Sequence, residues 1–431
     1  MKAVKGKIAF LCVLICLLFN TTIVCLSDES YEGRKAIPLD VNEFKYPKDV
    51  NLYPVMSDDK VKNVILLIGD GMGPGAIVAT RIRATGPAGS LYFERFPFVG
   101  IVKTQSANYL IPDSASNATA LATGFKTNNS MVGMSPKGVV YKTILEQARD
   151  CGFKTGLVVT STISHATPAC FASHIKNRDL EAEIAEQLVA NKVNVLFGGG
   201  REFFIPRKTP GSKRKDDKDV IMQAKDLGYT YIDDGNNLQE VKGDYILGLF
   251  GITHLTTRKP EPMLSELTQK AIEVLSDDEK KPFNGNLLGG IFNAVTLGLF
   301  DGDKEEGFFL MVEGSQIDFA AHLDDANDMI RQTLLFDEAV KKAVDFAMKD
   351  KHTLVLVTAD HDTGGPVITA GRLNGRRLTI RWASKDHTAT PVFIYAFGPG
   401  AQKFTGTMDN TEIPQKIAEL LKIKDFPKQM K

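Results

Sequence analysis

The chain has 431 residues, of which 43% are hydrophobic, enough to bury a sizeable core in one large α/β domain or two ordinary ones. Its 52 basic residues balance 52 acidic residues, so charge gives no reason to expect nucleic acid or an acidic membrane surface as the main partner. The composition is typical of a folded protein and disfavours a polyanion-binding one.

The N-terminus has the pattern of a secretory signal. Lys2, Lys5 and Lys7 precede the apolar run IAFLCVLICLLF, which is too short for a comfortable membrane span. We predict that residues 1–26 are a signal peptide that directs export to the periplasm or the extracellular space. An uncleaved signal anchor is the alternative, because the following NTTIVCLS contains no clean cleavage site.

Two cysteines, Cys151 and Cys170, remain once this segment is removed. In an oxidising compartment one disulfide between them is conceivable, and two buried free thiols are the equally open alternative. The sequence has no CxxC pair and no Cys/His spacing of a zinc finger.

Apolar runs and amphipathic stretches alternate after a polar lead-in at residues 27–60. The runs that indicate strands buried on both faces are 63–70, 155–161, 193–200, 307–314, 352–360 and 391–398. The stretches with helical periodicity are 141–152, 180–191, 263–278 and 324–350. This alternation predicts a mostly parallel central sheet flanked by helices on both faces, in a single α/β domain over residues 61–431.

Acids and histidines gather at the ends of these runs, where open parallel sheets bind their ligands. The residues at these positions are Asp70, His165, Thr167, Glu313, Asp360 and His361. The run GDGMGPG at 69–75 fails the G-x-G-x-x-G pattern of a dinucleotide site, and Asp70 would repel a pyrophosphate.

A metal site is indicated by Asp318 and His322, whose i, i+4 spacing on a helix lets both side chains hold one ion. That spacing alone is common on solvated helices. Four of the seven histidines fall in the strand-end segments, however, among them His387 just before the last strong strand. Carboxylate with imidazole favours zinc-like ions, whereas an all-oxygen set favours magnesium.

Two such ions about 4 Å apart can clamp the attacking and leaving oxygens of a phosphoryl transfer, and one of them can ionise a serine. A nucleophile is therefore expected. The run PDSASNATALATG at 112–124 places Ser114 at the N-terminus of a predicted helix. The helix dipole and free N–H groups there favour an alkoxide and a phosphate.

Six separated motifs, in order along nearly the whole mature chain, resemble the alkaline phosphatases. They are NVILLIGDGMG, PDSASNATALATGFKTNN, SHATPACFASHIKNR, MVEGSQIDFAAH, VTADHDTGG and DHTATPVFIYAFGPGA. The resemblance implies a three-layer α/β sandwich that hydrolyses phosphate monoesters with two Zn²⁺ and one Mg²⁺. The region at about 200–300 matches the family least clearly.

The resemblance also implies a role for each motif residue. Ser114 would be the nucleophile that forms a phosphoserine intermediate, Arg178 would grip two phosphate oxygens, and Asp113 would orient that arginine. One zinc would be held by Asp318, His322 and His387. The second would be held by Asp70, Asp360 and His361, with Ser114 as its reactive ligand. Magnesium would be held by Asp70, Thr167 and Glu313, with His165 close to it through water.

Several features depart from the family. Phe319 stands where many relatives place a lysine, histidine or tryptophan that reaches the phosphate, so phosphate affinity and metal balance are expected to differ. Only 25 residues separate His361 from His387, which leaves little room for the crown insertion of the animal enzymes. A homodimer stays possible, but its contacts cannot be assumed to come from such an insertion. The C-terminus lacks the apolar tail of a GPI signal. The sequons at Asn117 and Asn128 are interpreted as chance.

Two functions of other kinds stay open as alternatives. A related metal-dependent phosphodiesterase could use the same core, although Ser114 and Arg178 favour monoesters. A non-catalytic phosphate- or metal-binding protein is expected to lack at least one ligand, and none is missing here.

Overall fold

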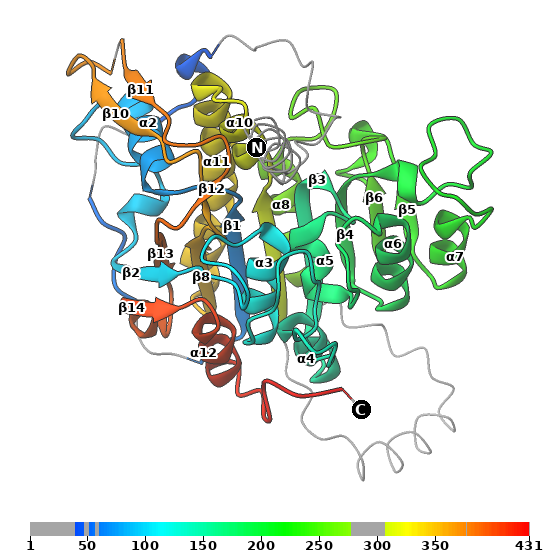
Figure 1. Ribbon diagram of the computed structural model, residues 1–431. Helices are drawn as coiled ribbons and strands as arrows, with labels where there is room; N and C mark the ends of the chain where they lie inside the picture. Colours follow the sequence, from blue (N-terminus) through cyan, green and yellow to red (C-terminus); the bar gives the residue numbers. More distant parts are fainter. Residues whose placement is uncertain (1–38, 47–50, 57–59, 277–306, 376, 431) are drawn as a thin grey trace, which may run out of the picture. The chain divides into compact units, whose positions relative to one another are not determined.

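The computed structural model describes residues 39–46, 51–56, 60–276, 307–375 and 377–430 (Figure 1). All of them fall in the unit that spans Ala36–Lys431. The predicted signal peptide at 1–26 and the apolar run GNLLGGIFNAVTLGLF lie outside the described residues. None of the helices described has the length and apolarity that a bilayer span requires.

The described residues form a ten-stranded sheet in the order β14-β2-β13-β8-β1-β7-β3-β4-β6-β5. Its strands are β1 (Asn63–Gly69), β2 (Phe98–Lys103), β3 (Lys154–Thr162), β4 (Val195–Gly199), β5 (Thr230–Ile232), β6 (Ile246–Leu249), β7 (Phe308–Gly314), β8 (Thr353–Thr358), β13 (Val392–Phe397) and β14 (Gly406–Asp409). All six predicted strands are confirmed. Those not predicted, β2, β5, β6 and β14, lie towards the two edges and are short or alternate between buried and exposed residues.

The direction of β13 differs from that of its neighbours. β1 pairs in parallel with β7 and β8, and β3 pairs in parallel with β4 and β7. β13 is antiparallel to both β8 and β2. The start of β13 therefore lies at the edge where the parallel strands have their carboxyl ends.

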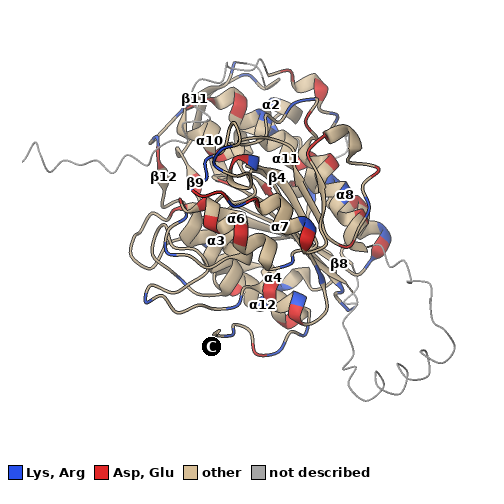
Figure 2. Ribbon diagram, turned by 90° about the vertical axis from the view of Figure 1, so that its right-hand side faces the viewer, with Lys and Arg blue, Asp and Glu red and all other residues tan. Residues whose placement is uncertain are grey.

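Helices cover both faces of the sheet, as predicted. They are α2 (Pro74–Thr85), α3 (Ser114–Thr123), α4 (Ile144–Asp150), α5 (Ala166–Ala172), α6 (Glu181–Ala190), α7 (Val220–Asp226), α8 (Leu264–Ser276), α10 (Gln316–His322), α11 (Ala326–Asp350) and α12 (Glu412–Leu420). In Figure 1, α3, α4 and α5 lie in front of the sheet and α8 and α11 behind it. Figure 2 shows basic and acidic residues interspersed over another side of the molecule, in keeping with the balanced charge of the sequence.

The core lies between the sheet and these two helix layers. Every residue of β1, β7 and β8 is buried, because strands covered on both faces have no solvent-facing side. The described part of the region at about 200–300 supplies β5, β6, α7 and α8, and its two strands extend the same sheet. Two small sheets lie beyond the strand ends: β9 (Asp362–Thr363) pairs with β12 (His387–Thr388), and β10 (Val367–Ala370) pairs with β11 (Thr379–Arg381).

Candidate active site

The first turn of α3 holds Ser114 in the interior, with only 2% of its surface exposed. The preceding Asp113 is the N-cap residue, and its side chain accepts a hydrogen bond from the N–H of Ser116 at 2.9 Å. At the other end Gly124, at φ 75°, adopts the left-handed conformation that ends the helix. The predicted helix N-terminus at Ser114 is confirmed.

His361, which follows β8, reaches this serine. Its Nε2 lies 3.3 Å from the Ser114 hydroxyl oxygen. The same nitrogen lies 3.1 Å from Oδ2 of Asp360 and 3.5 Å from Oδ1 of Asp70, at the end of β1. Residues at the ends of two adjacent parallel strands and at a helix N-terminus therefore converge, as the strand-end pattern predicts.

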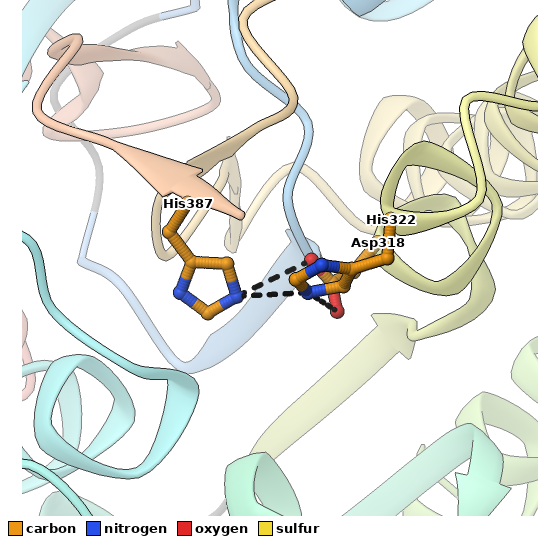
Figure 3. Close-up of side chains that lie close together, drawn as sticks. All are labelled: Asp318, His322 and His387. Carbon is orange, nitrogen blue, oxygen red and sulfur yellow. Dashed lines mark hydrogen bonds and ion pairs between the residues drawn. The ribbon is translucent and has the colours of Figure 1, made fainter. Parts of the chain in front are cut away.

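Asp318, His322 and His387 form a second group, shown in Figure 3. Nε2 of His322 lies 3.4 Å from one Asp318 oxygen, and Nε2 of His387 lies 3.6 Å from the other. The two Nε2 atoms are 3.2 Å apart. The i, i+4 pair does lie on a helix, α10, and its side chains point the same way.

The histidines of this group are oriented through their other ring nitrogens. Nδ1 of His322 donates to the carbonyl of Lys385 at 2.6 Å, and Nδ1 of His387 donates to the carbonyl of Pro112 at 2.8 Å. A ring held in this way, when neutral, presents its Nε2 lone pair towards Asp318. Such carbonyl contacts are how proteins fix the tautomer of metal-ligating histidines.

The two groups adjoin each other at Asp318. Asp70, Asp318 and His361 offer ligand atoms that all lie within 4.8 Å of one another, and so do Asp318, His322 and His387. The sequence predicted Asp360 with Asp70 and His361 for the second ion, and Oδ2 of Asp360 does lie 3.1 Å from Nε2 of His361, so Asp318 offers this set a further carboxylate. Oδ1 of Asp360 accepts from the N–H groups of Gly71 and His361, which orients its carboxylate beside that ring.

The residues expected to hold magnesium share buried oxygens that lack a hydrogen bond in the described part of the chain. These are both carboxylate oxygens of Asp70, the hydroxyl of Thr167 and Oε1 of Glu313. Burying such groups unpaired is costly, so a cation that they can all contact would offset the cost. An all-oxygen set of this kind suits a hard ion such as Mg²⁺.

Burial and neighbouring charges shift the pKa values of the acids and histidines in the candidate metal groups. Burial and the charge of Asp360 raise the pKa of Asp70 well above its usual range, and burial raises that of Glu313 to about 7. Burial and the neighbouring His361 lower the pKa of His387 to about 4. Burial opposes the charged form of His322, but the Asp318 carboxylate outweighs it and raises that pKa to about 9. A metal ion held by Asp318, His322 and His387 would balance the same carboxylate charge that raises this pKa.

Arg178 completes the site. Its Nη1 donates to Oδ2 of Asp113 at 3.4 Å, and its Nη2 lies 3.2 Å from Nε2 of His165. Oδ2 of Asp113 also accepts from the N–H of Ser130 at 2.9 Å. Although burial opposes ionisation of Asp113, Arg178 and these N–H groups lower its pKa and keep it a carboxylate. The predicted residues are thus brought together at one edge of the sheet.

Comparison with known proteins agrees with this arrangement. The family profile described as Alkaline phosphatase matches residues 61–376 and 371–423. The chain belongs to the alkaline phosphatase family. It is therefore an enzyme of the kind that hydrolyses phosphate monoesters, and the family resemblance found in the sequence is confirmed.

Individual members of the family match along most of their length. Alkaline phosphatase 4 of Bacillus subtilis is 31% identical over an alignment that covers 84% of this chain and 89% of that protein. Alkaline phosphatase of Escherichia coli is 31% identical over an alignment that covers 83% of this chain and 85% of that protein. The solved alkaline phosphatase of the Antarctic bacterium TAB5 has a TM-score of 0.72 and 32% identity, covering 86% of this chain and 100% of that one.

Three residues of this alkaline phosphatase site were not predicted. Thr363 donates its hydroxyl to Oδ1 of Asp318, and Ser315 donates to Oε2 of Glu313 at 2.7 Å. Each lies two positions from a predicted metal ligand, so its place in the sequence could have indicated it. His254 follows β6, whose short run did not indicate a strand.

The pairing of the two thiols is open from the sequence alone, and the first sequon is interpreted there as chance. Cys151 and Cys170 form no disulfide with each other, so the structure favours the alternative without one. The Cys170 thiol donates to the carbonyl of Ala115 at 3.2 Å, and burial raises its pKa to about 12. Asn117 is 1% exposed and donates to the carbonyl of Thr104 at 2.7 Å, an environment that leaves no space for a glycan.

Proposed function

We propose that this enzyme hydrolyses phosphate monoesters through a phosphoserine intermediate on Ser114, in a site that holds two Zn²⁺ and one Mg²⁺. The observation that carries the proposal is the Ser114 hydroxyl at a helix N-terminus, 3.3 Å from the His361 ring. A serine that only begins a helix would not need the imidazole of His361, and the acids beside it, from the ends of β1 and β8.

The donor sets support the proposed metals. Imidazole and carboxylate from Asp318, His322 and His387 suit zinc. Asp70, Asp360 and His361 offer a second set of the same chemistry. The unpaired oxygens of Asp70, Thr167 and Glu313 suit magnesium. A structure of a TAB5 enzyme variant, with a TM-score of 0.71 to this chain, is described with Mg bound in its M3 site.

When bound, the ions supply positive charge that favours the ionised serine and shields the phosphate oxygens. The chain itself supplies the rest. Ser114 Oγ forms a bond to phosphorus while the bond from phosphorus to the leaving-group oxygen breaks. Water then forms a new bond to phosphorus as the Ser114 bond breaks, which releases inorganic phosphate.

The phosphate is oriented by Arg178, whose planar guanidinium can bind two of its oxygens. Asp113 holds one end of that guanidinium and His165 the other. The N-terminus of α3, where Ser114 lies, also favours negative charge. The predicted signal at residues 1–26 supports export of the enzyme, which sequencing of the mature N-terminus tests.

The experiment is turnover of p-nitrophenyl phosphate across pH by protein loaded with zinc and magnesium. Bis-p-nitrophenyl phosphate serves as the diester, and acid quenching followed by mass spectrometry detects a phosphorylated residue. We expect monoester turnover and a phosphate on Ser114. Faster diester turnover would support the phosphodiesterase alternative. Phosphate binding without any turnover would support the binding-protein alternative.

A further inference from the structure

His254 lies beside the predicted site residues but was not itself predicted to belong to the site. It follows β6, in the region that matches the family motifs least clearly, and is 4% exposed. Its segment is tied to the sheet on both sides. The carbonyl of Thr253 accepts from the N–H of Gly200 at 2.7 Å, and the N–H of Leu255 donates to the carbonyl of Thr160 at 3.0 Å. The backbone that carries His254 is therefore fixed.

The imidazole itself is fixed by one hydrogen bond. Nδ1 of His254 accepts from the backbone N–H of Thr162, the last residue of β3, at 2.9 Å. Because Nδ1 is the acceptor, the neutral ring carries its proton on Nε2. This bond sets the tautomer of the ring, whereas the rings packed against it hold its plane.

The ring of His254 packs against two others that face the active site. Its centroid lies 5.8 Å from that of His165, with the planes at 88°, and 4.9 Å from that of Phe319, at 58°. His165 and Phe319 meet edge to face as well, 5.7 Å apart at 85°. His165 thus has an aromatic neighbour on each of two elements, α10 and the segment after β6. Such contacts are favourable beyond the area that they bury.

The orientation of His165 matters because of what it binds. A guanidinium has only donors, so Nε2 of His165 must accept the hydrogen bond from Nη2 of Arg178 at 3.2 Å. Any rotation of the His165 ring moves that acceptor. Nη1 of Arg178 stays on Asp113, so the guanidinium plane would turn.

We propose that His254, together with Phe319, is a positioning residue for Arg178 that acts through the ring of His165. The inference rests on the proposed function, in which Arg178 orients the phosphate. Phe319 offers the phosphate no polar atom of its own, so orientation depends on Arg178. By holding the ring of His165, the His254 and Phe319 rings would determine how well Arg178 is oriented and therefore how tightly a terminal phosphate is bound.

Two variants separate this role from simple anchoring of the chain. H254N keeps an oxygen that can accept from the N–H of Thr162 but removes the ring. H254F keeps the ring but removes the acceptor. F319L removes the other ring and leaves the Thr162 hydrogen bond intact. It therefore tests the aromatic packing against His165 even where a change at 254 impairs folding. H352N is the matched control, because His352 precedes β8 at the opposite edge of the sheet.

The measurements are the dissociation constant of inorganic phosphate by calorimetry and kcat and KM for p-nitrophenyl phosphate, with metal-loaded protein. We expect H254N and F319L to weaken phosphate binding and raise KM roughly tenfold or more, with a smaller change in kcat. H254F should stay within about threefold of the parent. Nitrogen-15 NMR of the histidines should show the Nε2 signal of His165 shifting in H254N and not in H352N.

The opposite pattern would overturn the inference. If H254N and F319L bind phosphate as the parent does while H254F loses binding, His254 only anchors the end of β3. The phosphate-binding comparison does not need turnover. Failure of the proposed function, seen as an inactive parent that still binds phosphate, is therefore distinguishable from failure of this inference.

Discussion

The Ser114 hydroxyl oxygen and Nε2 of His361 lie 3.3 Å apart, although 247 positions separate them in the chain. The contact exists because α3 begins where β8 ends. It places a nucleophile beside a group that can bind a metal ion, at the point where the helix presents free N–H groups. The proposed role of each residue depends on this contact with the other.

Replacing the nucleophile tests that contact directly. S114A should lower kcat for p-nitrophenyl phosphate at least about 10³-fold, because the covalent route is lost, while zinc content and phosphate binding persist. S116A is the control: the Ser116 hydroxyl bonds to the carbonyl of Asp113 and to Asn129, away from the metal ligands. An S114A enzyme with near-parent kcat would rule out the phosphoserine mechanism.

Asp113 is expected to serve both stability and phosphate binding. In D113N one oxygen can still cap α3, but the new amide faces the N–H of Ser130 or the Arg178 guanidinium, donor against donor. We expect a loss of about 1–3 kcal/mol in the free energy of unfolding, together with a raised KM. Denaturant titration and steady-state kinetics measure the two effects.

The comparison for D113N is D219N. Asp219 caps α7 through the N–H of Met222 at 2.8 Å and faces solvent. Asparagine caps a helix about as well as aspartate, so this change should cost only a few tenths of a kcal/mol. Equal losses in the two variants would mean that Arg178 and Ser130 contribute nothing at Asp113.

Asp318 belongs to both metal groups, whereas His322 belongs to one. D318A should therefore lose about two equivalents of zinc and H322A about one. Metal analysis after gel filtration counts them, with H352A as a control outside the site. Loss of a single equivalent from D318A would mean that Asp70, Asp360 and His361 hold the second ion without help from Asp318.

Asp337 gives the fold a pH dependence of its own. It is fully buried in α11, where the Tyr46 hydroxyl donates to it at 2.7 Å and the N–H of Tyr92 at 2.8 Å. Burial raises its pKa to about 7 although these hydrogen bonds lower it. The unfolded carboxyl ionises near pH 4, so between about pH 4 and 7 the folded state holds the extra proton. Its contribution to stability therefore falls as pH rises through that window, by up to about 1.4 kcal/mol per unit.

D337N should remove the part of this slope that Asp337 contributes. Guanidinium titrations from pH 4.5 to 7.5, with chelator present in all samples, compare the variant with the parent. D345N, two turns further along α11 and half exposed, should keep the parent slope. If D337N and the parent lose stability in parallel, Asp337 does not titrate in this range.

The sequence by itself determined those strands and helices whose burial shows in their own residue pattern. The runs of β1, β7 and β8 are apolar at almost every position because both faces are covered, and this pattern is local. The cap at Asp113 and the stop at Gly124 are local too, so α3 could be predicted. The family motifs added the residue roles, since their polar residues are spaced along the chain in a fixed order.

Only the tertiary structure decided which of these elements meet, and how. The run of β13 does not encode its antiparallel direction, yet that direction brings the preceding His387 to the edge where Asp318 lies. Likewise β6 is too short to stand out, so the place of His254 against His165 could not be foreseen. The physical reason is that periodicity reports burial along one segment, whereas pairing direction and the distances between side chains depend on packing among segments far apart in the chain.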